Sequence, residues 1–152
     1  MNFLYELFHN VIFVSAILGW FIAQVLKTMI HLFITKKFVM ERMVGSGGMP
    51  SSHSATVCAL ATSAGMTYGG GSAEFAIAVI FAIVVMHDAM GVRRETGIQA
   101  RVINEMLEIF TNMGNKMSPE EKLKEFVGHT PLQVLAGAIL GILIAVLICN
   151  LM

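Results

Sequence analysis

The chain has 152 residues, of which 56% are hydrophobic and 13% charged, and its formal net charge is zero. Soluble domains carry about 25% charged residues, so this composition, with a mean hydropathy of +0.74, indicates an integral membrane protein of one domain, residues 1–152. The basic residues form no long patch interleaved with aromatic residues, which argues against a nucleic-acid partner.

The two cysteines, Cys58 and Cys149, lie apart within apolar segments. Because they form neither a CxxC motif nor a cluster with histidines, they indicate no zinc site and no disulfide framework. We expect no metal and no cofactor. The N-terminal residues lack a basic region and a small-residue cleavage site, so we expect the first apolar segment to be retained as a membrane helix.

The first apolar segment, residues 11–30, has about the twenty residues that a membrane-spanning helix needs. Lys27, near its end, is expected to extend toward the membrane interface. Residues 31–44 mix charged and apolar side chains, which suggests a surface connection or a short amphipathic piece.

The second predicted helix, residues 54–68, is short and rich in Ala, Ser, Thr and Gly. Small residues allow helices to pack closely in a membrane, so we expect this helix to lie inside the bundle. Residues 69–72 form a predicted tight turn. The third predicted span, residues 73–90, is strongly apolar until His87 and Asp88.

Residues 91–128 are rich in charge, and their apolar residues recur at spacings of three and four. This pattern predicts an amphipathic helix outside the membrane or lying on it, and Ser118 followed by Pro119 is typical of a further helix start. The last predicted span, residues 131–151, has Thr130 as its cap and opens with Pro131. We therefore predict an all-α membrane bundle of about four transmembrane helices with amphipathic helices on the cytoplasmic side.

The distribution of basic residues predicts the orientation of the bundle. All ten Lys and Arg residues lie between residues 27 and 124, and with four crossings all of them map to one side of the membrane. By the positive-inside rule, this side faces the cytoplasm. The same side receives the glycine-rich stretch 45–55, His87, Asp88 and His129. We therefore expect a polar site facing the cytoplasm in a bacterial-type inner or plasma membrane.

The stretch GSGGMPSSHSA, residues 45–55, has the composition of an anion site. The glycines Gly47 and Gly48 let the backbone approach a ligand, and Ser51 or Ser52 offers a hydroxyl donor. The helix that follows adds its N-terminal amides and the positive end of its dipole. His53 is placed for proton transfer. The alternative is an ordinary loop with a capping serine and a histidine that contacts water.

Further polar residues are expected beside this stretch. His129 precedes the last helix, and Gln133 should contact it only if His129 joins the first helical turn. Arg93 and Arg94 offer guanidinium groups that suit phosphate oxygens. Asp88 is expected to orient an arginine or a histidine, or else to form a purely structural ion pair.

Three segments, GGMPSSHSA, HDAMGVRRETGIQA and GHTPLQVLAG, resemble the divergent branch of the type 2 phosphatidic acid phosphatase family, which is related to the vanadium haloperoxidases. The resemblance extends from about residue 24 to residue 141. It implies that Ser51 binds phosphate, that His53 protonates the leaving group and that His129 is the nucleophile. It also implies that Lys27 grips the phosphate. The family's arginines have no match at their usual spacing, and Arg93 and Arg94 take their place by topology alone.

One residue departs from the family pattern. Gln133 stands where an acidic residue is expected. In the serine-protease template a comparable acid-to-amide change costs about 10⁴ in turnover. We therefore expect slow hydrolysis, or recruitment of Asp88 instead, or phosphate binding without hydrolysis.

The resemblance favours a membrane lipid phosphatase that hydrolyses a lipid phosphomonoester or pyrophosphate through a phosphohistidine, without a metal. The alternatives are a non-catalytic binder or transporter of anionic phospholipid or polyprenyl phosphate headgroups, and a structural membrane subunit. The expected partners are the bilayer and a lipid phosphate. The small size of the bundle makes a homodimer a further expectation.

Overall fold

The computed structural model describes residues 2–36, 48–113, 123 and 128–152. Within these ranges the chain is helical and contains no strand, which confirms the predicted all-α class. The helices are α1 (Phe3–Phe8), α2 (Val11–Thr35), α3 (Ser52–Tyr68), α4 (Ala73–Met90), α5 (Val92–Asn112) and α6 (Pro131–Leu151).

Among the described residues, three helical stretches are long and apolar enough to cross a membrane: α2, α6 and the stretch Ala73–Thr111, whose apolar part is α4. Many of their large apolar side chains are exposed to the surroundings, as expected where lipid takes the place of water. With 17 residues, α3 is shorter than these three helices. The protein is an integral membrane helical bundle, as its composition predicts.

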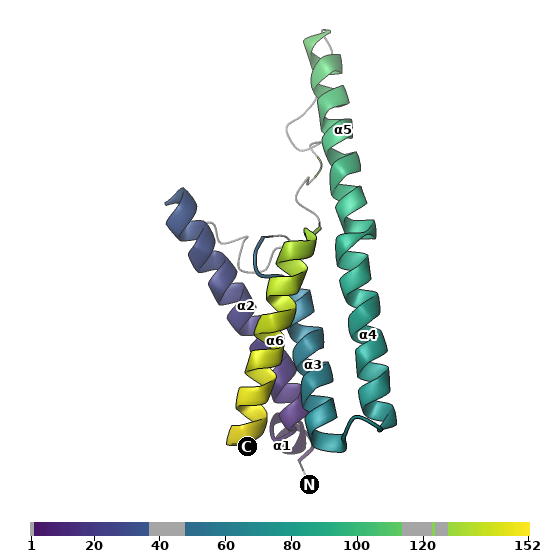
Figure 1. Ribbon diagram of the computed structural model, residues 1–152. Coiled ribbons are helices and arrows are strands. Elements are labelled where there is room, and N and C mark those ends of the chain that lie inside the picture. Colours follow the sequence, from purple (N-terminus) through teal and green to yellow (C-terminus); the bar gives the residue numbers. More distant parts are fainter. Residues whose placement is uncertain (1, 37–47, 114–122, 124–127) are drawn as a thin grey trace.

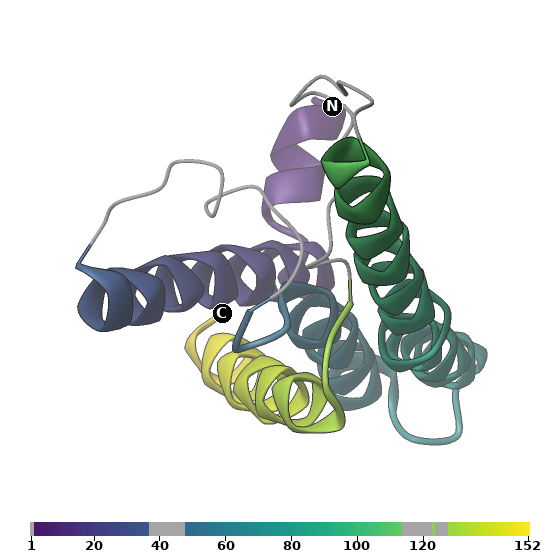
Figure 2. The ribbon, with the colours of Figure 1, turned by 90° about the horizontal axis from the view of Figure 1, so that it is seen from above.

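Helix α3 is the inner helix of the bundle, as its small residues predict. It packs against α2, α4 and α6, and the two ribbon views show it between them (Figures 1 and 2). Its buried positions are almost all Ala or Ser, including Ala55 and Ala59, which are fully buried. Since protein rather than lipid surrounds α3, a weak hydropathy signal is compatible with its position.

Glycines set the closest helix crossings. On α6, Gly137 and Gly141 face the backbone of α3, and a Cβ atom on either would overlap the carbonyl oxygen of Ser51 or Ala55. On α2, a Cβ on Gly19 would lie 3.0 Å from the Ala55 oxygen. The spacing of Gly137 and Gly141 is the small-xxx-small pattern that brings membrane helices together.

The observed helix bounds differ from the predicted ranges most clearly at the end of α2. Helix α2 continues to Thr35, so residues 31–35 are helical rather than part of a connection, and the helix ends where Lys36 turns left-handed at φ 54°. Its start follows from the side chain of Asn10, which accepts hydrogen bonds from the first-turn amides. The short helix α1 was not predicted.

Helix α5 covers the first part of the segment for which an amphipathic helix is predicted. It continues α4 in the same general direction and extends beyond the rest of the bundle (Figure 1). The side chain of Asn104 binds the backbone of Leu123 twice, at 2.9 Å in each bond. The predicted helix start at Ser118 lies outside the described residues.

The C-terminal ends of α2 and α4 and the N-terminal ends of α3 and α6 lie at the same end of the bundle (Figure 1). We call this the site end. The two chain termini lie at the opposite end. The alternation of helix directions thus brings together the segments that the sequence places on one side.

Candidate active site

Two histidines meet at the site end. His53 lies in the first turn of α3, and His129 lies just ahead of α6. Their ring centroids are 6.3 Å apart, with the planes inclined at 63°. His129 is only 3% exposed. A group bound between the two rings can therefore contact both imidazoles.

The backbone around His129 is held against the junction of α4 and α5. The His129 amide donates to the Ala89 carbonyl over 3.0 Å. A Cβ atom on Gly128 would lie 2.5 Å from the backbone of Arg94, so only glycine fits there without displacing the start of α5. These contacts fix the position from which the imidazole extends.

Gln133 orients the His129 ring. The Gln133 amide oxygen accepts from the Thr130 backbone N–H over 3.1 Å, within a capping box at the start of α6. His129 Nδ1 lies 3.3 Å from the same oxygen. Since a backbone N–H only donates, this atom must be the amide oxygen, and Nδ1 must therefore carry the ring proton. In the neutral tautomer with its proton on Nδ1, Nε2 carries the lone pair.

We expected from the sequence that Gln133 would contact His129 only if His129 joined the first turn of the last helix, and this condition was wrong. His129 does not join the first turn of α6, because it precedes the cap residue Thr130. The Gln133 side chain instead folds back over the helix start to satisfy the capping box, and this brings its oxygen to the imidazole.

The surroundings of His129 lower its pKa and so favour the neutral ring. Burial is the main cause that lowers the pKa of His129, and the nearby charges of His53 and Lys27 add to it. Hydrogen bonds with the Gln133 side chain and the Gly48 backbone act in the opposite direction but do not reverse the shift. The neutral ring is the form that can act as a nucleophile.

We expected Lys27 to extend to the membrane interface, but its side chain is only 4% exposed and is directed into the bundle. Its ammonium lies 3.4 Å from Ser52 Oγ, and Ser52 donates its hydroxyl proton to Gln24 Oε1 over 3.0 Å. We overlooked Gln24 in the sequence. The available signal was its position three residues before Lys27, which puts two polar side chains on one face of a membrane helix.

Gly48 and Ser51 shape the loop that enters α3. Gly48 has φ +86°, and a Cβ there would lie 3.1 Å from Cδ of Lys27, so the loop backbone passes directly over the lysine stem. Ser51 is fully buried and caps α3, since its hydroxyl accepts from the Ser54 amide over 3.3 Å. Its amide donates to the Gln133 carbonyl over 3.0 Å. Gly47 lies outside the described residues.

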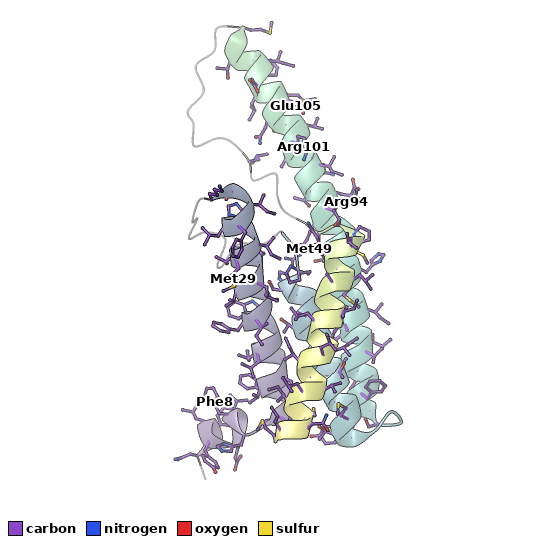
Figure 3. All side chains as sticks on the ribbon, turned by 60° about the vertical axis from the view of Figure 1, so that its left-hand side comes forward. Phe8, Met29, Met49, Arg94, Arg101 and Glu105 are labelled. Atoms are coloured by element: carbon purple, nitrogen blue, oxygen red, sulfur yellow. The ribbon has the colours of Figure 1, made fainter. Side chains whose placement is uncertain are left out.

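Asp88 pairs with Arg93 rather than with a histidine. The carboxylate accepts from Arg93 Nε over 2.6 Å, and both side chains are partly exposed. An arginine bound through Nε retains its terminal amino groups as donors for an anion. Arg94 is exposed at the start of α5, on the same end of the molecule (Figure 3).

The chemistry of these side chains fits an anion. The charges of Lys27 and Arg93 lie close enough to act on the His53 imidazole, and the Asp88 carboxylate is paired with Arg93. No group of three or more His, Cys, Asp or Glu side chains suited to a metal ion occurs in the part of the chain that the structure describes.

Comparison with known proteins bears on the family of the chain. The sequence profile of the divergent PAP2 family matches residues 8–144. The chain is 38% identical to the uncharacterised membrane protein YuiD of Bacillus subtilis strain 168, over 94% of this chain and 96% of that protein. No solved structure matches it. From the family match over most of its length, the chain belongs to the divergent PAP2 family of membrane proteins.

Proposed function

We propose that the protein is a membrane phosphatase that hydrolyses a phosphomonoester or pyrophosphate of a lipid through a phosphohistidine. The observation that carries this proposal is the pairing of His53 with a buried His129 whose Nδ1 faces the Gln133 amide oxygen. One imidazole has the form of a nucleophile, and the other is near enough to exchange a proton with the same phosphoryl group.

In the first step, the lone pair of His129 Nε2 forms a bond to phosphorus while the bond from phosphorus to the leaving oxygen breaks. His53, in its protonated form, gives its proton to that oxygen. In the second step, water attacks phosphorus, the P–N bond breaks, and His53 takes a proton from the water. The products are the lipid alcohol, or a shorter lipid phosphate, and inorganic phosphate.

The remaining side chains stabilise the charge on the phosphoryl oxygens. Lys27, Arg93 and Arg94 supply positive charge, and the N-terminus of α3 with the adjacent Gly48 adds backbone dipoles. Ser51 and Ser52 support the loop and the lysine. Gln133 fixes the tautomer of His129, as the expected acid would, but contributes no negative charge.

We further propose that the site end faces the cytoplasm of a bacterial-type inner or plasma membrane, and that residues 1–152 form one domain. The basic residues that flank the bundle support this orientation. Within the described ranges they all belong to segments at the site end: Lys36, Arg93, Arg94 and Arg101. A site at the interface suits a substrate with a phosphate headgroup and an apolar tail. The homodimer stays a prediction.

Phosphate release tests the proposal directly. Purified full-length protein in detergent with a chelator should release phosphate from phosphatidate or a polyprenyl phosphate. We expect His129→Ala to lower kcat by at least about 10³-fold, because it removes the attacking nitrogen. His87→Ala is the matched control, since His87 is exposed near the same end. No release from any lipid phosphate by the wild type, or full activity of His129→Ala, contradicts the proposal.

The uncharged Gln133 favours one alternative, a non-catalytic binder of lipid phosphate headgroups. That function predicts saturable binding without hydrolysis, which survives His129→Ala and weakens with Arg93→Ala. Measuring both lipid phosphate binding and phosphate release with the same protein preparations distinguishes the two functions.

A further inference from the structure

We infer that Gln24 is a positioning residue of this site, which directs the ammonium of Lys27, rather than the hydroxyl of Ser52, toward the bound anion. The inference rests on the proposed phosphate site and assigns a role to a residue outside the segments that resemble the family's motifs. It follows from three buried side chains, each less than 10% exposed, where α2 meets α3: Gln24, Lys27 and Ser52.

The hydrogen-bond directions carry the argument. Ser52 has one hydroxyl proton, and it donates that proton to Gln24 Oε1 over 3.0 Å. The lone pairs of the same hydroxyl then accept from Lys27 Nζ over 3.4 Å. As long as Gln24 holds the proton, Ser52 is an acceptor for Lys27 and not a donor to phosphate.

The backbone around this cluster leaves Lys27 little freedom. Its stem lies under Gly48, and its charge acts on the nearby His129 ring. The crossing of α2 over α3 is held close by Gly19 against Ala55. Ser52 is an acceptor for the ammonium, and Gln24 fixes how the Ser52 hydroxyl is turned.

The role of Gln24 requires that its side chain is uncharged as well as that it offers an oxygen. A carboxylate at this position would pair with Lys27, three residues further along the same helix, and cancel the charge that an anion needs. A hydrocarbon would leave the Ser52 proton without its acceptor. Gln133 likewise offers an uncharged amide oxygen to His129. Two amide oxygens thus orient the His129 ring and the Ser52 hydroxyl without adding negative charge to the site.

The test compares Gln24→Glu and Gln24→Leu with Gln99→Glu and Gln99→Leu, which make the same changes at an exposed position of α5. Inorganic vanadate is the probe, and its affinity for the full-length protein in detergent is measured by calorimetry, together with kcat and KM for the lipid phosphate. At pH 8 we expect Gln24→Glu to weaken vanadate binding about tenfold or more. The Gln99 variants should bind as the wild type does.

The pH profile separates positioning from a general structural defect. Lowering the pH protonates the introduced carboxyl, so the affinity of Gln24→Glu should recover toward the wild-type value within the same folded protein. Gln24→Leu has no group to protonate, and its weaker binding should not recover. We expect its KM to rise more than its kcat falls, because the lysine contributes to binding the phosphate.

The outcomes distinguish this inference from the proposed function. Gln24 variants that match their Gln99 controls in affinity, KM and pH profile overturn the role of Gln24 and leave the phosphatase intact. Vanadate binding that depends on Gln24 without any hydrolysis supports the role of Gln24 and overturns the phosphatase. A wild-type protein that neither binds vanadate nor hydrolyses any lipid phosphate overturns both.

Discussion

At the scale of single residues, the site uses amide oxygens where charged groups are commonly found. The capping box at the start of α6 directs the Gln133 oxygen toward both the Thr130 amide and the His129 ring. An isolated amide beside a histidine is free to flip and present its NH₂ group. Here the Thr130 donor excludes that orientation, so the Gln133 oxygen favours a proton on Nδ1 of His129, as the expected acid would.

Replacing Gln133 with Glu should therefore increase activity. A carboxylate accepts the same two hydrogen bonds and suits a capping box, and it also stabilises the imidazolium that forms during turnover. We expect kcat to rise about tenfold, equivalent to about 1.4 kcal/mol. Gln133→Leu should instead lower kcat and destabilise the helix start by about 1 kcal/mol. Single-turnover hydrolysis and thermal unfolding in detergent measure the two effects, and equal rates for Gln133→Glu and Gln133→Leu would contradict the assigned role.

The pKa of His129 predicts the acid side of the pH profile. Because burial lowers this pKa, the neutral nucleophile should persist to a pH below the ordinary histidine value of about 6.5. As pH falls through the pKa of His129, protonation removes the lone pair on Nε2 and kcat/KM should fall. In Gln133→Glu the carboxylate raises that pKa, so the acid limb should move to higher pH. An acid limb that stays in place in this variant would show that another group controls it.

At the scale of the helices, the contact between α6 and α3 sets the geometry of the site. Gly137 and Gly141 bring α6 against the backbone at Ser51 and Ala55, and Ser51 then donates to the Gln133 carbonyl. The two histidines sit on the two helix starts that this contact joins. The distance between the imidazoles is therefore determined by residues that do not touch the ligand.

Enlarging Gly141 should separate the two helix starts. We expect Gly141→Leu to destabilise the protein by about 1–3 kcal/mol, because its side chain would overlap the Ala55 carbonyl, and to abolish hydrolysis. Gly70→Ala is the control, since the turn around Gly70 leaves open space for a Cβ. Thermal unfolding in detergent measures both variants. Normal stability of Gly141→Leu would show that the crossing is looser than described.

At the scale of the whole molecule, the direction of the helices gathers the polar segments at one end and leaves the chain termini at the other (Figure 1). Helix α5 carries exposed charged residues away from the bundle at the site end. The turn between α3 and α4, residues 69–72, lies at the opposite end. These two exposed segments make the orientation in the membrane measurable.

We predict that the site end faces the cytoplasm. In a background with Cys58→Ala and Cys149→Ala, a membrane-impermeant maleimide applied to intact cells should label Gly71→Cys and not Glu95→Cys. Both positions are exposed in the structure, so access depends only on the side of the membrane. Inverted membrane vesicles should show the reverse pattern, and labelling of Glu95→Cys in intact cells would contradict the prediction.

The sequence by itself determined the class of the protein and the approximate ranges of its apolar helices, and it predicted which polar segments share one side. Hydropathy and helix caps are local properties that a sequence shows directly. The direction of each helix follows from counting membrane crossings, and this predicted that His53 and His129 share a face. Only the tertiary structure decided that Lys27 is bound inside the bundle, that Gln24 holds Ser52, and that Gln133 contacts a histidine outside its helix. These contacts depend on how closely α2, α3 and α6 approach one another and on the side-chain conformations where they meet. The periodicity of a single segment contains information on neither.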